Sequence, residues 1–155
     1  MRRLFIATVI ATSLIPAGVL ANAGHDHQKE DSAVGRPGDP QNISKTIKVE
    51  MSDTMRFTPA RITARRGQTI KFVVTNTGKV RHEMVLGTAG ELRAHAALMR
   101  KFPEMEHADA NQITLEAGKT GEIVWQFTRG GTFDFACLEP GHLEAGMIGK
   151  VEVAQ

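Results

Sequence analysis

Hydrophobic and polar residues alternate in short segments from about residue 44 to the end of the chain. A two-residue period is typical of strands that bury one face of a sheet. Turn-forming residues separate the segments, as in Arg66-Gly67-Gln68 and Ala117-Gly118-Lys119. The expected strands cover residues 46–51, 61–64, 69–75, 80–86, 113–115, 122–127, 132–136 and 150–153. This pattern predicts an all-β fold, an antiparallel Greek-key β-sandwich.

One segment has helical periodicity instead. Thr88 and Glu91 have the spacing of a capping box, and Pro103 ends the pattern. The residues that would share one face of this helix are Leu92, His95, Ala96 and Met99. We therefore expect one short helix inserted between strands.

Residues 1–23 have the pattern of a signal peptide. Arg2 and Arg3 precede an apolar stretch, and Ala21-Asn22-Ala23 resembles a cleavage site. Pro16 and Gly18 interrupt the apolar stretch, which argues against a membrane anchor. We expect export to the periplasm, removal of this segment and no membrane insertion afterwards.

Residues 24–43 are polar and rich in Gly, Pro and Asp, and they show no hydrophobic period. They predict a flexible leader that carries His25 and His27, followed by a single domain over residues 44–155. Loss of the signal peptide also removes two arginines and no acidic residue, which leaves equal numbers of basic and acidic residues. No basic patch indicates a nucleic-acid partner.

The chain has one cysteine, so an internal disulfide is excluded. Cys137 is then an inert buried thiol, an intermolecular link or a metal ligand. His142 and Met147 follow it at five-residue intervals, and Gly141 and Gly146 directly precede them. Glycine permits tight turns that would direct these side chains to one centre. A thiol, an imidazole and a thioether form a ligand set for soft metals.

A further ligand candidate is His82, whose alternating segment places it on the core face with Val80, Met84 and Leu86. A buried imidazole needs a partner, either a hydrogen bond or a metal. The adjacent soft ligand set favours the metal.

The spacing Cys137, His142, Met147, with His82 after the turn Asn76-Thr77-Gly78, resembles the cupredoxin family of type 1 copper proteins, which includes plastocyanin and azurin. The resemblance spans residues 46–153. It implies one type 1 copper with His82, Cys137 and His142 in a trigonal plane and Met147 as a weak axial ligand.

The helix insertion with its methionines and the histidine-containing leader resemble, more narrowly, periplasmic cupredoxins associated with bacterial copper tolerance. One residue departs from the family pattern: many cupredoxins have Asn after the first histidine ligand, where it ties the two ligand-bearing segments together, and this chain has Glu83.

Other metal centres fit the sequence less well. Structural zinc sites use four strong ligands, and methionine is a poor fourth. A dinuclear copper centre needs a second cysteine, and multicopper oxidases often have His beside the cysteine, where this chain has Ala136 and Leu138. We therefore expect no enzyme, apart from a weak Cu(I)-oxidising activity.

Further histidines and methionines form a candidate secondary copper site. These residues are His25, His27, His95, Met99, Met105 and His107. The alternative is that the methionines fill core gaps and the histidines are solvated.

Three functions remain open. The first is a periplasmic copper-binding protein that cycles Cu(I) and Cu(II) in copper tolerance. The second is a soluble one-electron carrier between respiratory partners, and the third is a metal-free binding module. The expected partners are a copper ion and a periplasmic redox protein, and we expect a monomer.

Overall fold

The computed structural model describes residues 32–102 and 109–155. The expected signal peptide lies outside these residues, as do His25, His27, Met105 and His107. Within the described part, no helix is both long and apolar enough to cross a membrane.

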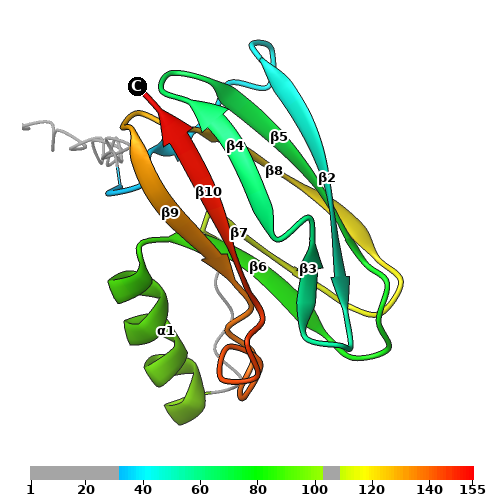
Figure 1. Ribbon diagram of the computed structural model, residues 1–155. Coiled ribbons are helices and arrows are strands. Elements are labelled where there is room, and N and C mark those ends of the chain that lie inside the picture. Colours follow the sequence, from blue (N-terminus) through cyan, green and yellow to red (C-terminus); the bar gives the residue numbers. More distant parts are fainter. Residues whose placement is uncertain (1–31, 103–108) are drawn as a thin grey trace, which may run out of the picture.

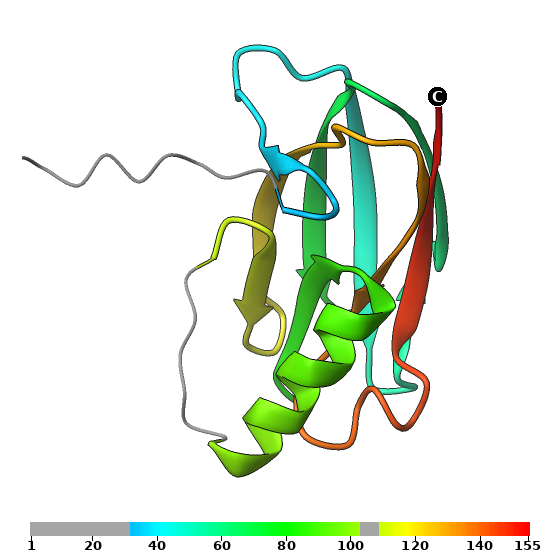
Figure 2. The same ribbon diagram turned by 90° about the vertical axis from the view of Figure 1, so that its left-hand side faces the viewer.

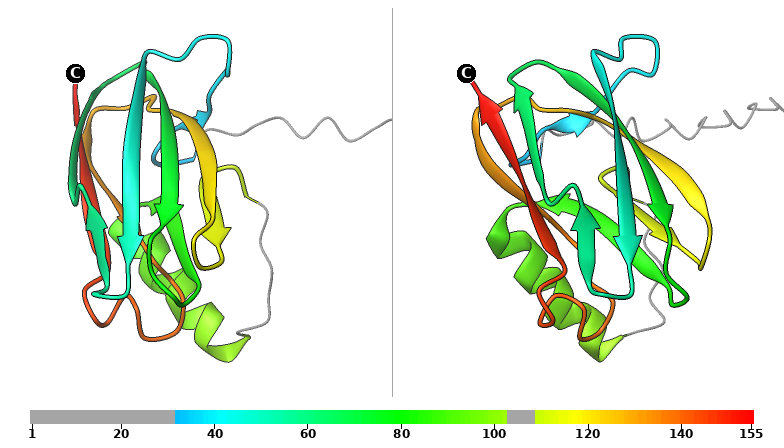
Figure 3. Two further views of the ribbon diagram at one scale, coloured as in Figure 1. Left: turned by 90° about the vertical axis from the view of Figure 1, so that its right-hand side faces the viewer. Right: turned by 45° about the vertical axis from the view of Figure 1, so that its right-hand side comes forward.

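Two five-stranded sheets pack face to face, which confirms the expected β-sandwich with one helix (Figure 1). The first sheet contains, in spatial order, β1 (Arg36–Pro37), β8 (Thr120–Gln126), β5 (Thr69–Asn76), β2 (Lys45–Ser52) and β3 (Arg56–Thr58). The second contains β4 (Arg61–Arg65), β10 (Ile148–Ala154), β9 (Gly131–Ala136), β6 (His82–Gly87) and β7 (Gln112–Leu115). In the left view of Figure 3, β3, β2, β5 and β8 of the first sheet lie side by side in front of α1.

Alternation along the strands forms the core between the sheets. In β4, Ile62 and Ala64 are buried while their neighbours are exposed, and β10 buries Val151 and Val153 in the same manner. β6 departs from this rule because all six of its residues are buried. The helix covers the outer face of β6, so both faces of this strand are shielded from solvent.

That helix, α1 (Ala89–Lys101), lies across the outer side of β6 and β9 (Figure 2). The capping box is formed as predicted, with Thr88 and Glu91 each accepting a backbone hydrogen bond from the other. Leu92 and Ala96 pack in a small cluster with Val85 of β6.

The sheets are mixed, which corrects the antiparallel expectation. β2 pairs parallel with β5, and β4 pairs parallel with β10. The chain leaves β2, passes through β3 and crosses to β4 in the other sheet before it returns in β5. The chain reverses direction between β2 and β3 and again at the turn between β4 and β5, so β5 runs in the same direction as β2.

The end of the expected flexible leader also differs, because residues from Ser32 onward belong to the folded part. Val34 is 1% exposed within the core, and β1 pairs with β8. A Cβ on Gly35 would lie 2.1 Å from the carbonyl oxygen of Gln126, so only glycine allows this close approach. The domain boundary expected at residue 44 therefore moves to an earlier position.

Val80, expected on the core face with His82, is 46% exposed. β6 begins only at His82, since the amides of Lys79 and Val80 donate to the carboxylate of Asp53 instead of joining a strand ladder.

Candidate metal centre

The four expected ligand residues belong to two neighbouring strands and one loop at the same end of the sandwich. His82 is the first residue of β6, and Cys137 directly follows the last residue of β9. His142 and Met147 lie in the loop that leads from β9 to β10. Because β6 and β9 are paired, the first histidine and the thiol are fixed next to each other.

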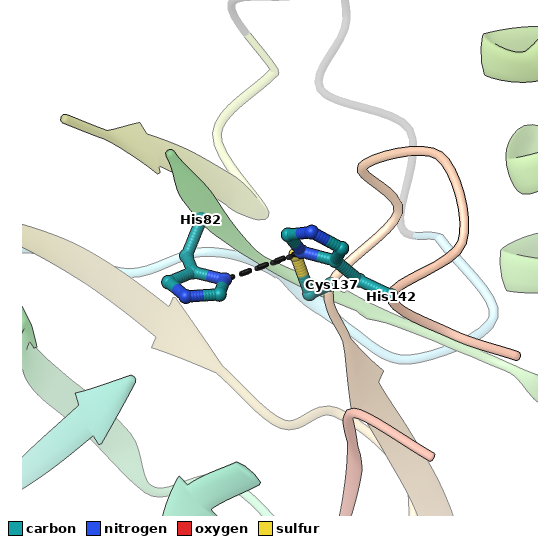
Figure 4. Close-up of side chains that lie close together, drawn as sticks. All are labelled: His82, Cys137 and His142. Atoms are coloured by element: carbon teal, nitrogen blue, oxygen red, sulfur yellow. Dashed lines mark hydrogen bonds between the residues drawn. The ribbon is translucent and has the colours of Figure 1, made fainter. Parts of the chain in front are cut away.

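Three of these side chains converge on one point. The two imidazoles and the sulfur face one another in Figure 4. The Nδ1 atoms of His82 and His142 are 3.2 Å apart, and the Cys137 Sγ lies 3.9 Å and 3.2 Å from them, respectively. Among residues 32–102 and 109–155, these three form the group of His, Cys and carboxylate residues that could hold a metal ion.

These separations fit a small first-row metal ion. With bonds of about 2.0–2.3 Å to nitrogen and sulfur, a trigonal plane places its donors about 3.5–3.8 Å apart. His82 and Cys137 are completely buried and His142 is partly exposed, so the plane would be dry on all but one side. The thiolate and imidazole donors suit copper.

The loop folds back on itself as the glycines predict. Gly141 and Gly146 have φ of 87° and 88°, a left-handed conformation that glycine adopts without strain. The Met147 amide donates to the His142 carbonyl at 3.0 Å, and the Cys137 amide donates to the Met147 carbonyl at 3.1 Å. Met147 is completely buried in the same cluster as Cys137, and its axial role remains a proposal.

Comparison with known proteins agrees with this geometry. Residues 43–154 match the family described as copper binding proteins, plastocyanin/azurin family. This chain belongs to that family. It is a copper-binding cupredoxin, as the ligand spacing predicted.

Three curated relatives carry the name copper-resistant cuproprotein CopI, among them the following two. The one from Rubrivivax gelatinosus is 51% identical, with 95% of this chain and 94% of the relative covered. The one from Vibrio cholerae is 37% identical, with 79% and 73% covered. Among solved structures, auracyanin from Roseiflexus castenholzii has a TM-score of 0.62 at 24% identity, covering 73% of this chain and 99% of its own, which is a likeness of fold.

Glu83 takes the place of the asparagine that many cupredoxins have after the first histidine, and it joins the two ligand-bearing segments of this cupredoxin. Its Oε1 accepts a hydrogen bond from the Leu138 amide at 2.9 Å. Its own amide donates to the Cys137 sulfur at 3.4 Å. Glu83 is 4% exposed, and burial raises its pKa to about 7. The substitution therefore keeps the connection and adds a buried carboxyl group.

Burial also shifts the pKa values of the other titratable groups of the site. Burial raises the pKa of the Cys137 thiol to about 12 in the metal-free protein. Burial also lowers the pKa of His142, and the adjacent His82 lowers it further. The imidazole therefore offers a neutral nitrogen to a metal, whereas the thiol must release a proton.

Three supporting residues were missed by the sequence analysis. Asp53, in the turn after β2, lies beside His82. Asn76, at the end of β5, donates to the carbonyls of Val80 and Leu115 at 2.8 and 2.9 Å and so shapes the segment before His82. Arg56 of β3 donates to two carbonyls of the ligand loop. No motif marks these residues, and only the turn residues around Asn76 gave a signal.

Of the six residues of the candidate secondary copper site, the structure describes two. His95 and Met99 lie on α1, and Met99 is 5% exposed, as expected for a packing methionine. His95 does not join the three converging donors. The other four residues lie outside the described part, so the secondary site remains a prediction.

Proposed function

We propose that this cupredoxin is an exported type 1 copper protein that acts in copper tolerance, with His82, Cys137, His142 and Met147 as ligands. The observation that carries the proposal is the convergence of two Nδ1 atoms and one Sγ at mutual distances of 3.2–3.9 Å. The names of the curated relatives support the role in tolerance.

Each ligand has a distinct role. Copper, when bound, supplies a one-electron exchange between Cu(I) and Cu(II). Cys137, once deprotonated, supplies a strong soft donor, and the two histidines supply neutral nitrogens that suit both oxidation states. Met147 supplies only a weak thioether, which stabilises Cu(II) less than a strong donor in the same place would. Paired strands and loop hydrogen bonds hold these groups and limit their rearrangement.

Export to the periplasm follows from the signal-peptide pattern of residues 1–23. In this location the protein, as a monomer, would take up copper and pass an electron to or from a redox protein. Any oxidation of Cu(I) is then this single-electron step, with the redox protein accepting the electron.

Copper titration of the purified protein tests the site. We expect one equivalent of Cu(II) to produce an intense thiolate-to-copper absorption band. Met147→Leu should retain copper and raise its reduction potential, because the weak axial donor is lost. A protein without any copper-dependent visible absorption would instead be a metal-free binding module.

Growth experiments test the role in tolerance. Deletion of the gene should sensitise cells to copper, and the wild-type gene should restore growth where the Cys137→Ser gene does not. Equal growth of all three strains across a copper series would contradict the role in tolerance.

The exposure of His142 supports a second candidate function, electron transfer. It is the one candidate ligand of the four that reaches solvent, and Pro140 and Leu143 beside it are also accessible. Stopped-flow mixing with periplasmic cytochromes tests this function. Electron exchange no faster than that of free copper would exclude a dedicated carrier.

A further inference from the structure

Asp53 reaches the candidate copper site from the opposite sheet. It follows β2 directly, whereas His82 begins β6 in the other sheet. The Asp53 Oδ1 lies 3.2 Å from the His82 Nε2. Since the His82 Nδ1 faces the other two donors, the carboxylate contacts the far side of the same imidazole.

This arrangement defines the tautomer of His82. A carboxylate accepts hydrogen bonds, so Nε2 must carry the proton that is shared with Asp53. Nδ1 then has a free lone pair directed at the metal position. A hydrogen bond from the remote nitrogen of a histidine ligand to a carboxylate orients the ring and makes the imidazole a stronger donor.

The position of the carboxylate is built into the backbone around it. Both oxygens of Asp53 accept from the Lys79 amide, at 3.0 and 2.8 Å, and Oδ1 also lies 3.4 Å from the Val80 amide. A Cβ on Gly78 would lie 2.0 Å from Oδ1. The absence of a side chain at residue 78 is therefore required for Asp53 to reach His82.

We propose that Asp53 is a positioning residue that fixes the His82 tautomer and biases the copper site toward Cu(II). The inference rests on the proposed function, because it requires His82 to be a copper ligand. A negative charge behind the imidazole stabilises a doubly charged ion more than a singly charged one. Asp53 thus stabilises Cu(II), which the weak thioether does little to stabilise, and lowers the reduction potential.

The decisive variant is Asp53→Asn, which retains the shape and one acceptor oxygen but removes the charge. We expect Cu(II) affinity to fall about tenfold, the lower end of the effect of such outer contacts on metal sites. Cu(I) affinity should change less. If it stays constant, the potential rises by about 59 mV, which is a tenfold change for one electron. The thiolate-to-copper band should persist.

The matched control is Asp39→Asn. Asp39 is an exposed carboxylate in the segment between β1 and β2, at the opposite end of the sandwich from the ligand loop (Figure 1). Asp39→Asn removes the same charge from a residue that does not contact the site. Equal potentials and affinities in the Asp39 and Asp53 variants would overturn the inference. Absence of the band from the wild-type protein would instead overturn the proposed function itself.

A second variant keeps the test valid if Asp53→Asn does not fold. Gly78→Ala retains the carboxylate but displaces it, so the potential should again rise. Nitrogen-15 spectra of the metal-free protein give a readout without copper. We expect the Nε2–H tautomer of His82 in the wild type and a mixture of tautomers in Gly78→Ala. An unchanged tautomer and an unchanged potential would contradict the positioning role.

Discussion

The Cys137–Met147 loop and the turn at Asp53 approach the candidate copper site from two sides, and they hold it by different means. The loop contributes three candidate ligands within eleven residues, and backbone hydrogen bonds and left-handed glycines determine its path. The turn at Asp53 contributes no candidate ligand and acts through a carboxylate that accepts hydrogen bonds. Ligands are thus concentrated locally, whereas their support comes from distant segments.

The two carboxyl groups beside His82 extend this comparison. Glu83 is buried, and its pKa is raised because burial disfavours its charge. Asp53 has a side chain that is 40% exposed, and its pKa is lowered, first by the hydrogen bond from the Lys79 amide. Similar groups therefore differ in charge according to solvent access and backbone donors. Glu83, which joins the ligand loop to β6, therefore tends to be neutral, whereas Asp53, which contacts His82, is ionised.

The largest expected effect is that of Cys137→Ser, which removes the central donor of the loop. The thiolate-to-copper band should disappear, since a serine oxygen is a much weaker donor to copper. The His82–Asp53 contact should remain, because the turn does not depend on the sulfur. Visible absorption reports on the copper ligands of the loop, and nitrogen-15 spectra report on the contact between His82 and Asp53. A band that survives the substitution would refute the ligand assignment.

Glu83→Gln should change the pH dependence of stability. The unfolded carboxyl has a pKa near 4.5 and the folded one near 7, so the folded protein binds more protons between these values. Stability therefore decreases as pH rises through this window, by about 3 kcal/mol in total. Glutamine cannot titrate, and its side-chain oxygen can still accept the Leu138 amide.

Urea unfolding of the metal-free protein at pH 5 and pH 8 checks this prediction. Relative to wild type, Glu83→Gln should gain about 3 kcal/mol between the two pH values. Asp53→Asn should not show such a gain, because the pKa of Asp53 is lowered rather than raised. Parallel pH profiles of wild type and Glu83→Gln would mean that Glu83 is already ionised in the folded protein.

The fold was largely predictable because alternation along a strand is a local property. All the expected strands are present, and the capping box located α1. β3 and β1 were missed, since a strand of two or three residues has no detectable period. The parallel pairings were missed as well, because the direction of a strand depends on the path of the chain between strands.

The candidate site also combines residues that could be predicted from the sequence with residues that could not. Cys137, His142 and Met147 form a short motif, and His82 stands out as a histidine at a core position. Asp53 contacts a residue twenty-nine positions away, and nothing near it in the sequence indicates that contact. Hydrogen bonds between distant segments require the folded backbone, so the supporting residues were not predictable.

Alanine substitutions in the ligand loop test how strongly the loop depends on its backbone conformation. Gly141→Ala and Gly146→Ala should each cost about 1–2 kcal/mol, since the left-handed conformation disfavours a Cβ. Gly67→Ala is the control, because Gly67 has φ of 84° and open space but lies in the turn after β4. All three should lose stability in urea, and only the loop variants should shift the copper band. A shifted band in Gly67→Ala would contradict this division.

The smallest expected effect concerns Arg56, which connects β3 to the ligand loop. Its Nη1 donates to the carbonyls of Ala145 and Gly146 at 3.0 and 3.3 Å. Arg56 is exposed, so Arg56→Met should cost at most about 1 kcal/mol of stability. Arg61→Met, which removes an exposed ion pair between Arg61 of β4 and Glu152 of β10, is the matched control.

Coupling between Arg56 and Gly146 gives the sharper measurement. A Cβ on Gly146 would lie 3.2 Å from the Arg56 Nη1, a tight contact, whereas no atom lies within 4 Å of the corresponding position on Gly141. The cost of Gly146→Ala should therefore be smaller when Arg56 is already Met, and the cost of Gly141→Ala should not change. A double-mutant cycle in urea separates these outcomes. If both glycines respond equally to the loss of Arg56, backbone conformation alone governs the loop, and its connection to β3 contributes nothing to its shape.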